Sequence, residues 1–134
     1  MFPDSINLPS TILIVDDEEF LLQYVRLVLV RAGYAVLTAE NGEEAWDLMA
    51  DNRQEIRLLL TDIVMPGSFD GFELAERARK RHPDLPVLFM TGAPLQANVS
   101  KGGLTGQRKL LRKPFLPDQL LTIVRESLKA ANRS

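Results

Sequence analysis

The chain is predicted to fold as an α/β protein, a three-layer α/β/α sandwich around a five-stranded parallel sheet. Short apolar runs alternate five times with amphipathic stretches along its 134 residues, as strands alternate with helices in this fold class. The segments between interior runs are long enough to cross over the sheet, so that neighbouring strands run parallel. Right-handed crossovers would then place helices on both faces of the sheet.

The expected strands are the apolar runs, and the expected helices are the amphipathic segments between them. The strands are Thr11–Val15, Ala35–Ala39, Arg57–Thr61, Val87–Met90 and Lys109–Arg112. The helices are Glu18–Ala32, Gly42–Asp51, Gly71–Arg81, a weak one near Leu95–Gly102, and Pro117–Ala130. Gly33 after the first helix and Pro117 at the start of the last support these boundaries. We expect residues 1–10 to be a flexible extension, residues 11–130 one domain and residues 131–134 a C-terminal tail.

The composition excludes several classes of function. Apolar residues make up 46% of the chain and charged residues 25%, which is the balance of an ordinary globular domain. The chain has no cysteine, which excludes disulfides, thiolate metal sites and a thiol nucleophile. A net charge of −2 argues against a nucleic-acid partner, and no apolar stretch reaches the ~18 residues of a membrane span. Because residues 1–10 do not resemble a signal peptide, we expect a cytoplasmic protein.

Polar side chains with distinct chemistry follow the expected strands at their carboxyl ends. Asp16 and Asp17 follow the first strand, Asp62 the third, Thr91 the fourth and Lys113 the fifth. These ends open on one edge of a parallel sheet, which is where α/β proteins bind ligands. Three carboxylates suit a hard divalent cation, most simply Mg²⁺, and a carboxylate can accept a phosphoryl group. The lysine and the threonine would then contact the phosphoryl oxygens.

The two adjacent aspartates also have a simpler interpretation. Together with Glu18 and Glu19 they would suit the first turn of a helix, where acidic side chains interact favourably with free N–H groups and the helix dipole. Taken alone, the pair does not decide between this role and a metal site. The presence of Asp62, Thr91 and Lys113 at the same edge favours the metal site.

Four motifs resemble those of the receiver domains of two-component response regulators, the CheY-like family. They are VDDE (Val15–Glu18), TDIVMPG (Thr61–Gly67), MTGA (Met90–Ala93) and KPF (Lys113–Phe115). The resemblance covers about residues 10–130 and implies a flavodoxin-like, doubly wound sheet of strand order 2-1-3-4-5. It also implies Mg²⁺-dependent transfer of a phosphoryl group from a phosphohistidine donor to Asp62, which switches protein–protein interactions.

The resemblance implies a role for each residue of the metal site. Asp62 would be the phosphoacceptor, and Asp17 and Asp62 would bind Mg²⁺ directly. Asp16 would act through a water molecule, and the main-chain carbonyl of Val64 would complete the set.

The resemblance further implies the remaining site residues and the partners. Thr91 would be the switch hydroxyl, and Lys113, followed by a peptide bond to Pro114 that is typically cis, the phosphate-binding lysine. Such a domain takes part in its own phosphorylation and dephosphorylation without being an enzyme. Its partner would be a histidine kinase or histidine phosphotransfer protein that docks on the first helix and the active-site loops. We expect neither nucleic acid nor a membrane as a partner, and a weak homodimer is left open.

One residue departs from the common family pattern at the output side. Leu110 stands where many relatives carry an aromatic residue three positions before the lysine. Leucine has no ring that could turn inward, which calls the usual threonine–aromatic relay into question. We therefore expect phosphorylation to shift the loops after Asp62 and Thr91 more than the face formed by the fourth helix, fifth strand and fifth helix.

Two further departures concern the loops around the expected phosphate. Val64 and Ala93 flank it and cannot orient an attacking water, which predicts slow self-dephosphorylation. The loop Met65–Leu74 is one residue longer than the commonest form, as in receivers attached to sensor kinases. Because no output domain follows residue 134, we expect either a free-standing receiver or, as the alternative, a receiver module excised from a hybrid histidine kinase or a larger regulator.

The expected first helix is unusually apolar. Its core face on a helical wheel would contain Leu21, Tyr24, Val25, Val28 and Ala32. Its other apolar residues fall on the flanks or the polar side: Phe20, Leu22, Leu27, Leu29 and Val30. These residues either broaden the core stripe or form a docking surface for partner helices. For a docking surface, truncating Leu22 or reversing the charge of Arg26 would slow phosphotransfer and leave stability nearly unchanged.

Two rival functions fit parts of the pattern. A Mg²⁺-dependent phosphohydrolase of the haloacid-dehalogenase type also forms an aspartyl phosphate, but it needs Asp-x-Asp after the first strand and a cap domain. An interaction domain without phosphorylation would need only the fold, and the complete set of acidic residues argues against it. His82 as a phosphodonor and Arg77–Arg81 as a nucleic-acid patch are both disfavoured against a solvated helix end. Trp46 is expected to pack rather than to bind.

Overall fold

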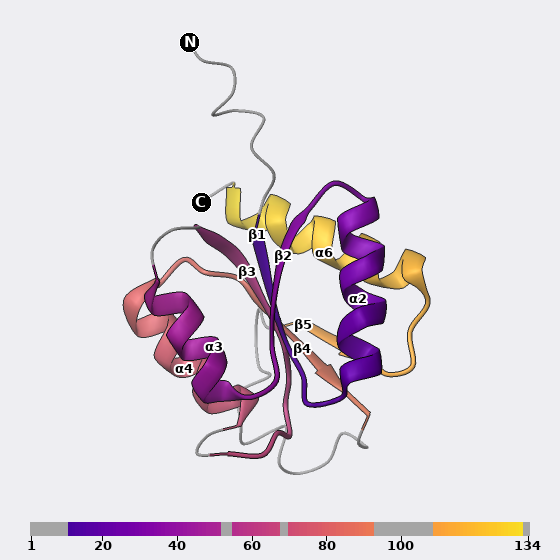
Figure 1. Ribbon diagram of the computed structural model, residues 1–134. Coiled ribbons are helices and arrows are strands. Elements are labelled where there is room, and N and C mark those ends of the chain that lie inside the picture. The colour runs from indigo at the N-terminus through magenta and orange to yellow at the C-terminus, as the bar shows by residue number, and fades with distance from the viewer. Residues whose placement is uncertain (1–10, 52–54, 68–69, 93–108, 133–134) are drawn as a thin grey trace.

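The computed structural model (Figure 1) describes residues 11–51, 55–67, 70–92 and 109–132. In chain order the elements are β1 (Thr11–Val15), α2 (Glu19–Arg31), β2 (Ala35–Ala39), α3 (Gly42–Ala50), β3 (Ile56–Asp62), α4 (Gly71–Arg81), β4 (Val87–Thr91), β5 (Lys109–Arg112) and α6 (Pro117–Asn132). Each bound lies within two residues of the sequence-based expectation, and α6 continues to Asn132 rather than ending at Ala130. The expected helix near Leu95–Gly102 and the N-terminal extension lie outside the described residues.

The described strands form one parallel sheet, and its order confirms the predicted fold class. The order is β2-β1-β3-β4-β5, with every neighbouring pair parallel. After β1 the chain moves outward to β2, and it then returns to the other side of β1 to form β3. Connections therefore leave β1 and β3 in opposite directions, which opens a crevice at the carboxyl ends of these strands. Asp16, which directly follows β1, and Asp62, the last residue of β3, lie at these ends.

Of the described helices, two cover each face of the sheet, as the sandwich prediction requires. Figure 1 shows α3 and α4 on one side of the sheet and α2 and α6 on the other. Strand β1 is buried along its whole length because its side chains alternate between these layers. Leu13 and Val15 join the core cluster shared with α3 and α4, whereas Ile12 and Ile14 join the cluster shared with α2 and α6. The site at the end of β1 therefore rests on a strand with a core on both sides.

Helix α2 is rotated about its axis relative to the sequence-based expectation. Leu22 and Leu29, expected on a flank, are buried with Val25 in the core, whereas Ala32 is exposed. Three residues expected at the centre of the core face are only partly buried: Leu21, Tyr24 and Val28. A helical wheel shows only which residues share a face. The buried face is set by packing, and α2 packs against α6 as well as against the sheet. Because Leu22 is buried, the prediction that its truncation would leave stability nearly unchanged is wrong.

Candidate metal centre at the carboxyl edge of the sheet

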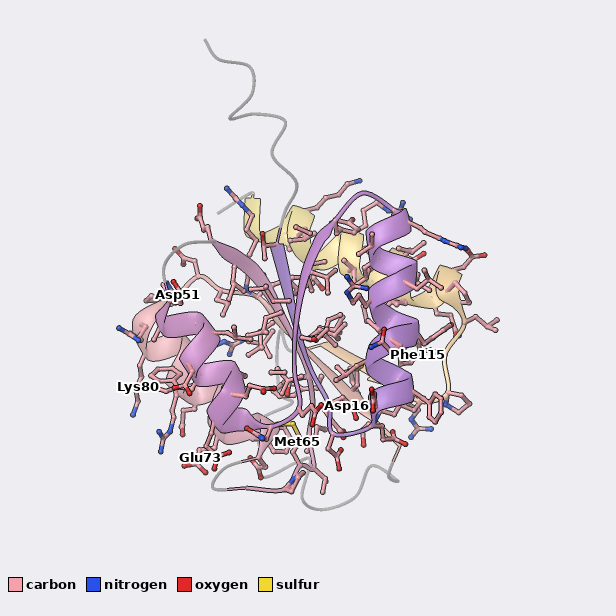
Figure 2. The ribbon with its side chains drawn as sticks, in the orientation of Figure 1. Asp16, Asp51, Met65, Glu73, Lys80 and Phe115 are labelled. Atoms are coloured by element: carbon pink, nitrogen blue, oxygen red, sulfur yellow. The ribbon has the colours of Figure 1, made fainter. Side chains whose placement is uncertain are left out.

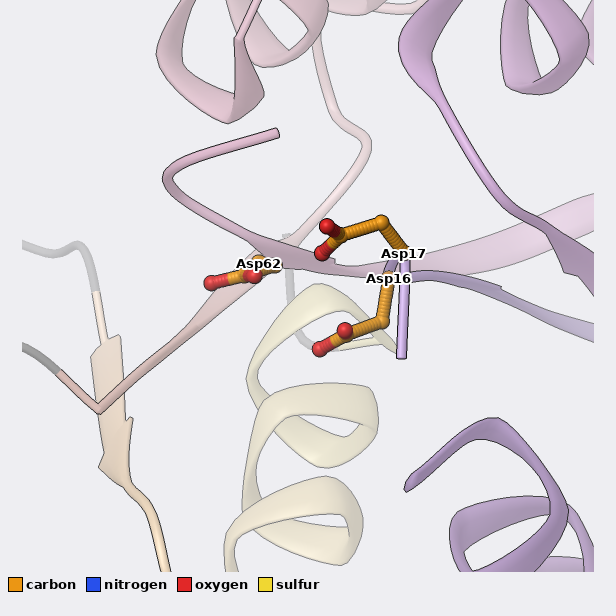
Figure 3. A group of neighbouring side chains, drawn as sticks. All are labelled: Asp16, Asp17 and Asp62. Carbon is orange, nitrogen blue, oxygen red and sulfur yellow. The ribbon is translucent and has the colours of Figure 1, made fainter. Parts of the chain in front are cut away.

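Three aspartates converge at the crevice between β1 and β3. Asp16 and Asp17 follow β1 directly, and Asp62 is the last residue of β3. Figure 3 shows the Asp16 and Asp17 side chains extending from the end of β1 toward Asp62. One carboxylate oxygen from each residue lies within 4.8 Å of the other two. Asp16 and Asp62 are buried and Asp17 is exposed, so the group forms a cup with one side open to solvent.

The lysine of the site reaches this cup from the far end of the sheet. Lys113 follows β5, and its main-chain N–H donates to the Thr91 carbonyl over 2.8 Å. Its ammonium lies 2.7 Å from Asp16 Oδ2, 3.2 Å from Glu18 Oε1 and 3.5 Å from Asp62 Oδ2. The side chain therefore spans the ends of β4 and β3, the two strands between β5 and β1. The peptide bond to Pro114 is cis, as the resemblance implied.

The buried carboxylates of the cup carry more negative charge than the single ammonium neutralises, and the pKa values of all three groups are shifted. Burial and, to a smaller extent, the neighbouring Asp16 carboxylate raise the pKa of Asp62 to about 6, although Lys113 and the Ile63 N–H act in the opposite direction. Burial also raises the pKa of Asp16 despite its pairing with Lys113. Burial lowers the pKa of Lys113, but its carboxylate neighbours outweigh burial and leave that pKa raised. One ammonium thus offsets two buried carboxylates only in part, and a divalent cation would relieve the remaining repulsion.

Asp16 has two roles that the sequence presented as alternatives. Its Oδ1 accepts a hydrogen bond of 2.8 Å from the Glu18 N–H, at the residue that precedes the first turn of α2. Its Oδ2 pairs with Lys113 over 2.7 Å. The helix-start contact and the contribution to the acidic cup therefore coexist in one side chain.

The loop after Asp62 is fixed by close main-chain packing. The Ile63 N–H donates to Asp62 Oδ1 over 2.8 Å, and the Gly71 N–H donates to the Ile63 carbonyl over 2.8 Å. A Cβ at Gly71 would overlap the Asp62 carbonyl oxygen, so only glycine fits at the start of α4. Gly67 has a φ of +106°, and a Cβ there would lie 2.6 Å from Glu43 Oε1 on α3. The start of α4 is therefore clamped against the main chain of Asp62, whereas Gly67 is required by its positive φ, since the Glu43 side chain could move aside.

The other predicted site residues lie at the same edge. Thr91 is the buried last residue of β4. Val64 lies in the turn after Asp62 with its side chain 68% exposed. Leu110 is partly buried in the core cluster shared with α3 and α4, and Ala93 lies outside the described residues. The structure thus pairs Lys113 with Asp16 and Asp62, places an Asp17 oxygen within 4.8 Å of both carboxylates, and places Thr91 and Val64 at the same edge.

Sequence reasoning missed two residues that act on the lysine segment. Glu18 pairs with the Lys113 ammonium, although its position in the VDDE motif identified it only as acidic. The Tyr24 hydroxyl donates to the Phe115 carbonyl over 3.0 Å, although the helical wheel placed this tyrosine in the core face. The spacing of residues gives no signal for either contact, because each joins segments far apart in the chain.

The residues for which a simpler role was preferred lie away from the cup. Trp46 is partly buried and packs against the core cluster shared with α3 and α4, with the Arg81 guanidinium carbon 5.4 Å from the centre of its ring. His82 is exposed and ends α4. Arg77 pairs with Glu73 one turn earlier on the same helix, over 3.4 Å.

The sheet order and the acidic cup with its lysine define a signalling receiver of the CheY-like kind. Residues 12–125 match the model of the response regulator receiver domain, and the chain belongs to that family. It is 36% identical to the response regulator receiver protein CpdR of Brucella abortus (strain 2308), a match that covers 90% of this chain and 98% of CpdR. A receiver protein from Sinorhizobium medicae WSM419 has a crystal structure similar to this fold, with a TM-score of 0.82, 30% identity and coverage of 92% of this chain and 97% of that one. The receiver domain of the hybrid histidine kinase CckA has a TM-score of 0.74 and 32% identity, and the match covers 89% of this chain and 99% of that domain.

Membership of this family confirms the predicted class of function. The protein is a receiver domain of two-component systems, a signalling module whose family interacts with histidine kinases or phosphotransfer proteins. Its cup of Asp16, Asp17 and Asp62 is of the type that binds a divalent metal ion. No helix in the described part of the chain is long and apolar enough to cross a membrane.

Proposed function

We propose that this receiver accepts a phosphoryl group on Asp62 from a phosphohistidine donor in the presence of Mg²⁺. The phosphorus–nitrogen bond of the donor would break as a bond forms between phosphorus and an Asp62 oxygen, and the electron pair would leave with the imidazole. The observation that carries this proposal is the convergence of three carboxylates with an ammonium group 3.5 Å from Asp62. This combination can neutralise both the acceptor and the incoming phosphoryl oxygens.

The donor set fits a magnesium ion. Asp17 and Asp62 would bind it directly, Asp16 through a water molecule, and the carbonyl of Val64 would complete the site. When bound, the ion supplies positive charge to the phosphoryl oxygens and lets the anionic acceptor approach them. The open side of the cup, next to the exposed Asp17, gives the ion and the donor access.

The lysine has two sets of partners in the proposed cycle. Before transfer, its ammonium pairs with Asp16 and Glu18 over 2.7 and 3.2 Å. After transfer, the ammonium would contact a phosphoryl oxygen on Asp62. Only a short movement is needed, since the ammonium already lies 3.5 Å from Asp62 Oδ2. The Thr91 hydroxyl would donate to another phosphoryl oxygen. Asp62 reacts as a carboxylate, and since its pKa is about 6 it is mostly ionised at pH 7.

The docking surface for the donor would lie on α2 and the segment after β5. Phe20 is 92% exposed and Leu27 51% exposed on α2, and Leu116 is 67% exposed at the residue before α6. The contact between Tyr24 and Phe115 holds that segment beside α2. Exposed apolar side chains at a site entrance suit the apolar face of a partner's helices. This surface keeps Phe20 and Leu27 from the one expected from the sequence and leaves out Leu22 and Leu29, which belong to the core.

Several finer assignments stay predictions. They are slow self-dephosphorylation, a cytoplasmic location, a weak homodimer, and the division into an extension, a receiver domain over residues 11–130 and a tail. The alternative of a module from a hybrid histidine kinase is supported by the likeness to the CckA receiver. Slow self-dephosphorylation is supported by the exposed, apolar side chain of Val64.

Incubation with acetyl phosphate tests the proposed function. We expect at most one phosphoryl group per chain by intact mass, formed with Mg²⁺, absent with excess chelator and absent in Asp62→Asn. Continuous release of phosphate over many turnovers would instead indicate the rival phosphohydrolase. If a folded wild type that binds Mg²⁺ took up no phosphoryl group, both the receiver function and the phosphohydrolase function would be contradicted.

A further inference from the structure

The segment that carries the lysine is anchored to three elements. At its start, the Lys113 N–H donates to the Thr91 carbonyl of β4 over 2.8 Å. At its end, the Leu116 N–H donates to Gln119 Oε1 in the first turn of α6 over 2.7 Å. Between them, the Phe115 carbonyl accepts the Tyr24 hydroxyl of α2 over 3.0 Å, across 91 positions of sequence. Among these anchors, only the tyrosine comes from the helix that carries the proposed docking surface.

The tyrosine is held in place by packing. Its ring lies against the Phe115 ring, with centroids 5.9 Å apart and planes inclined by 37°. Phe115 is buried in the core cluster between α2 and α6, and Tyr24 packs partly buried against that cluster. Figure 2 shows Phe115 beside α2. The hydroxyl is thus aimed at a carbonyl two residues after Lys113.

The segment that leads into the same helix supplies two partners of the lysine ammonium, Asp16 and Glu18. Glu18 precedes the first turn of α2, and its N–H fixes Asp16 Oδ1 over 2.8 Å. The ammonium contacts both carboxylates. The start of α2 therefore sets where the ammonium binds, while Tyr24 sets where the main chain of the lysine segment lies.

We propose that Tyr24 is a positioning residue that places the Lys113 ammonium through the Phe115 carbonyl, and so joins the docking surface to the reacting group. This inference rests on the proposed phosphorylation of Asp62. Phe20 lies one turn before Tyr24 on α2, and Leu116 directly follows Phe115, so a donor seated on these exposed side chains contacts both sides of the hydrogen bond. Without the hydroxyl, the segment keeps its hydrogen bonds to β4 and α6 but loses the hydrogen bond that fixes its position relative to α2.

The variant Tyr24→Phe removes only the hydroxyl and keeps the ring. Tyr34→Phe is its matched control, because Tyr34 is also partly buried against the same core cluster but directly precedes β2. With acetyl phosphate as the donor, we expect Tyr24→Phe to lower the maximal rate of Asp62 phosphorylation roughly three- to tenfold. We expect Tyr34→Phe to leave this rate unchanged, and both variants to keep a cooperative unfolding transition.

A second background separates positioning from a general loosening of the fold. In Lys113→Gln, the further change Tyr24→Phe should have no effect on the residual rate, because the group that it positions is gone. An equal loss of rate in both backgrounds, or an equal loss in Tyr34→Phe, would overturn the inference while wild-type phosphorylation upholds the proposed function. A wild type that forms no aspartyl phosphate would overturn both.

Discussion

The two segments that border the acidic cup are held in place by different forces. Beside the acceptor, close main-chain packing holds the start of α4, since an added Cβ at Gly71 would overlap the Asp62 carbonyl oxygen. The segment from Lys113 to Leu116 is held by the buried Phe115 ring and by single hydrogen bonds to β4, α2 and α6, two of which involve side chains. At Gly71 the acceptor strand therefore leaves no room for a methyl group, whereas the lysine segment has contacts to side chains that can be removed one at a time.

The largest expected effect comes from disrupting the main-chain packing between Gly71 and Asp62. Gly71→Ala should destabilise the fold by about 3 kcal/mol or more, because the new methyl group meets main-chain atoms that cannot move aside. This sign is opposite to the usual gain for Gly→Ala in a helix. Gly92→Ala is the control, since its nearest neighbour would be Lys113 Cδ at 3.8 Å, an ordinary contact. Urea unfolding of both variants measures the difference, and equal stabilities would show that the turn is not clamped.

The next effect concerns the lysine itself. Lys113→Gln should slow phosphorylation by acetyl phosphate about 100-fold, because a positive charge beside the phosphoryl oxygens is lost. The same change should tighten Mg²⁺ binding, since the ammonium no longer occupies Asp16 Oδ2. Arg112→Gln, which removes an exposed charge one residue earlier, serves as the control. Mg²⁺ titration and phosphorylation kinetics would be measured on both, and weaker Mg²⁺ binding by Lys113→Gln would contradict this account of the resting pair.

A smaller effect follows from the charge of the acceptor. The pKa of Asp62 is raised from 3.8 to about 6 in the folded chain, so ionisation above pH 4 opposes folding and its full cost is reached above pH 6. Asp62→Asn should therefore stabilise the Mg²⁺-free protein at pH 7 by about 1–3 kcal/mol. The gain should shrink as pH falls from 6 to 4, and it should also shrink when Mg²⁺ is added.

Unfolding of Asp62→Asn and wild type at pH 4 and pH 7 measures this difference. The exposed Asp17 offers the matched variant Asp17→Asn, for which we expect a smaller gain. A difference between Asp62→Asn and wild type that does not depend on pH would show that the acceptor carries no electrostatic penalty.

The smallest effect is confined to the α2 side of the molecule. Phe20→Ala should slow phosphotransfer from a phosphohistidine partner about tenfold, because the side chain is 92% exposed on the proposed docking surface. It should leave both stability and the rate with acetyl phosphate unchanged. Leu22→Ala should instead cost about 2–4 kcal/mol of stability, since it removes a buried side chain. A loss of the acetyl phosphate rate in a stable Phe20→Ala would place this residue in the site rather than on the docking surface.

The site could be predicted from the sequence because strand direction alone determines it. Once the apolar runs are assigned to parallel strands, the residues that follow them must meet at one edge, whatever the details of packing. Asp16, Asp62 and Lys113 meet there for this reason. The order of the strands was predicted only through the resemblance to the receiver family, since alternating runs fit several doubly wound sheets.

The parts that could not be predicted depend on contacts across the fold. The prediction of which face α2 buries was wrong because two neighbours, the sheet and α6, determine that face together. The hydrogen bond from Tyr24 to the Phe115 carbonyl depends on a side-chain direction and a loop path that no local pattern records. The pairing of Lys113 with Glu18 depends likewise on how far the lysine extends across the sheet edge.

The most direct test of the central claim is to locate the phosphoryl group. After reaction with acetyl phosphate and Mg²⁺, borohydride reduction converts an aspartyl phosphate to homoserine, and peptide mass spectrometry identifies its position. We predict homoserine at position 62 and at no other aspartate. Modification at Asp16 or Asp17, phosphate on His82, or an unmodified chain that has bound Mg²⁺ would contradict the claim that this cup makes Asp62 the phosphoryl acceptor.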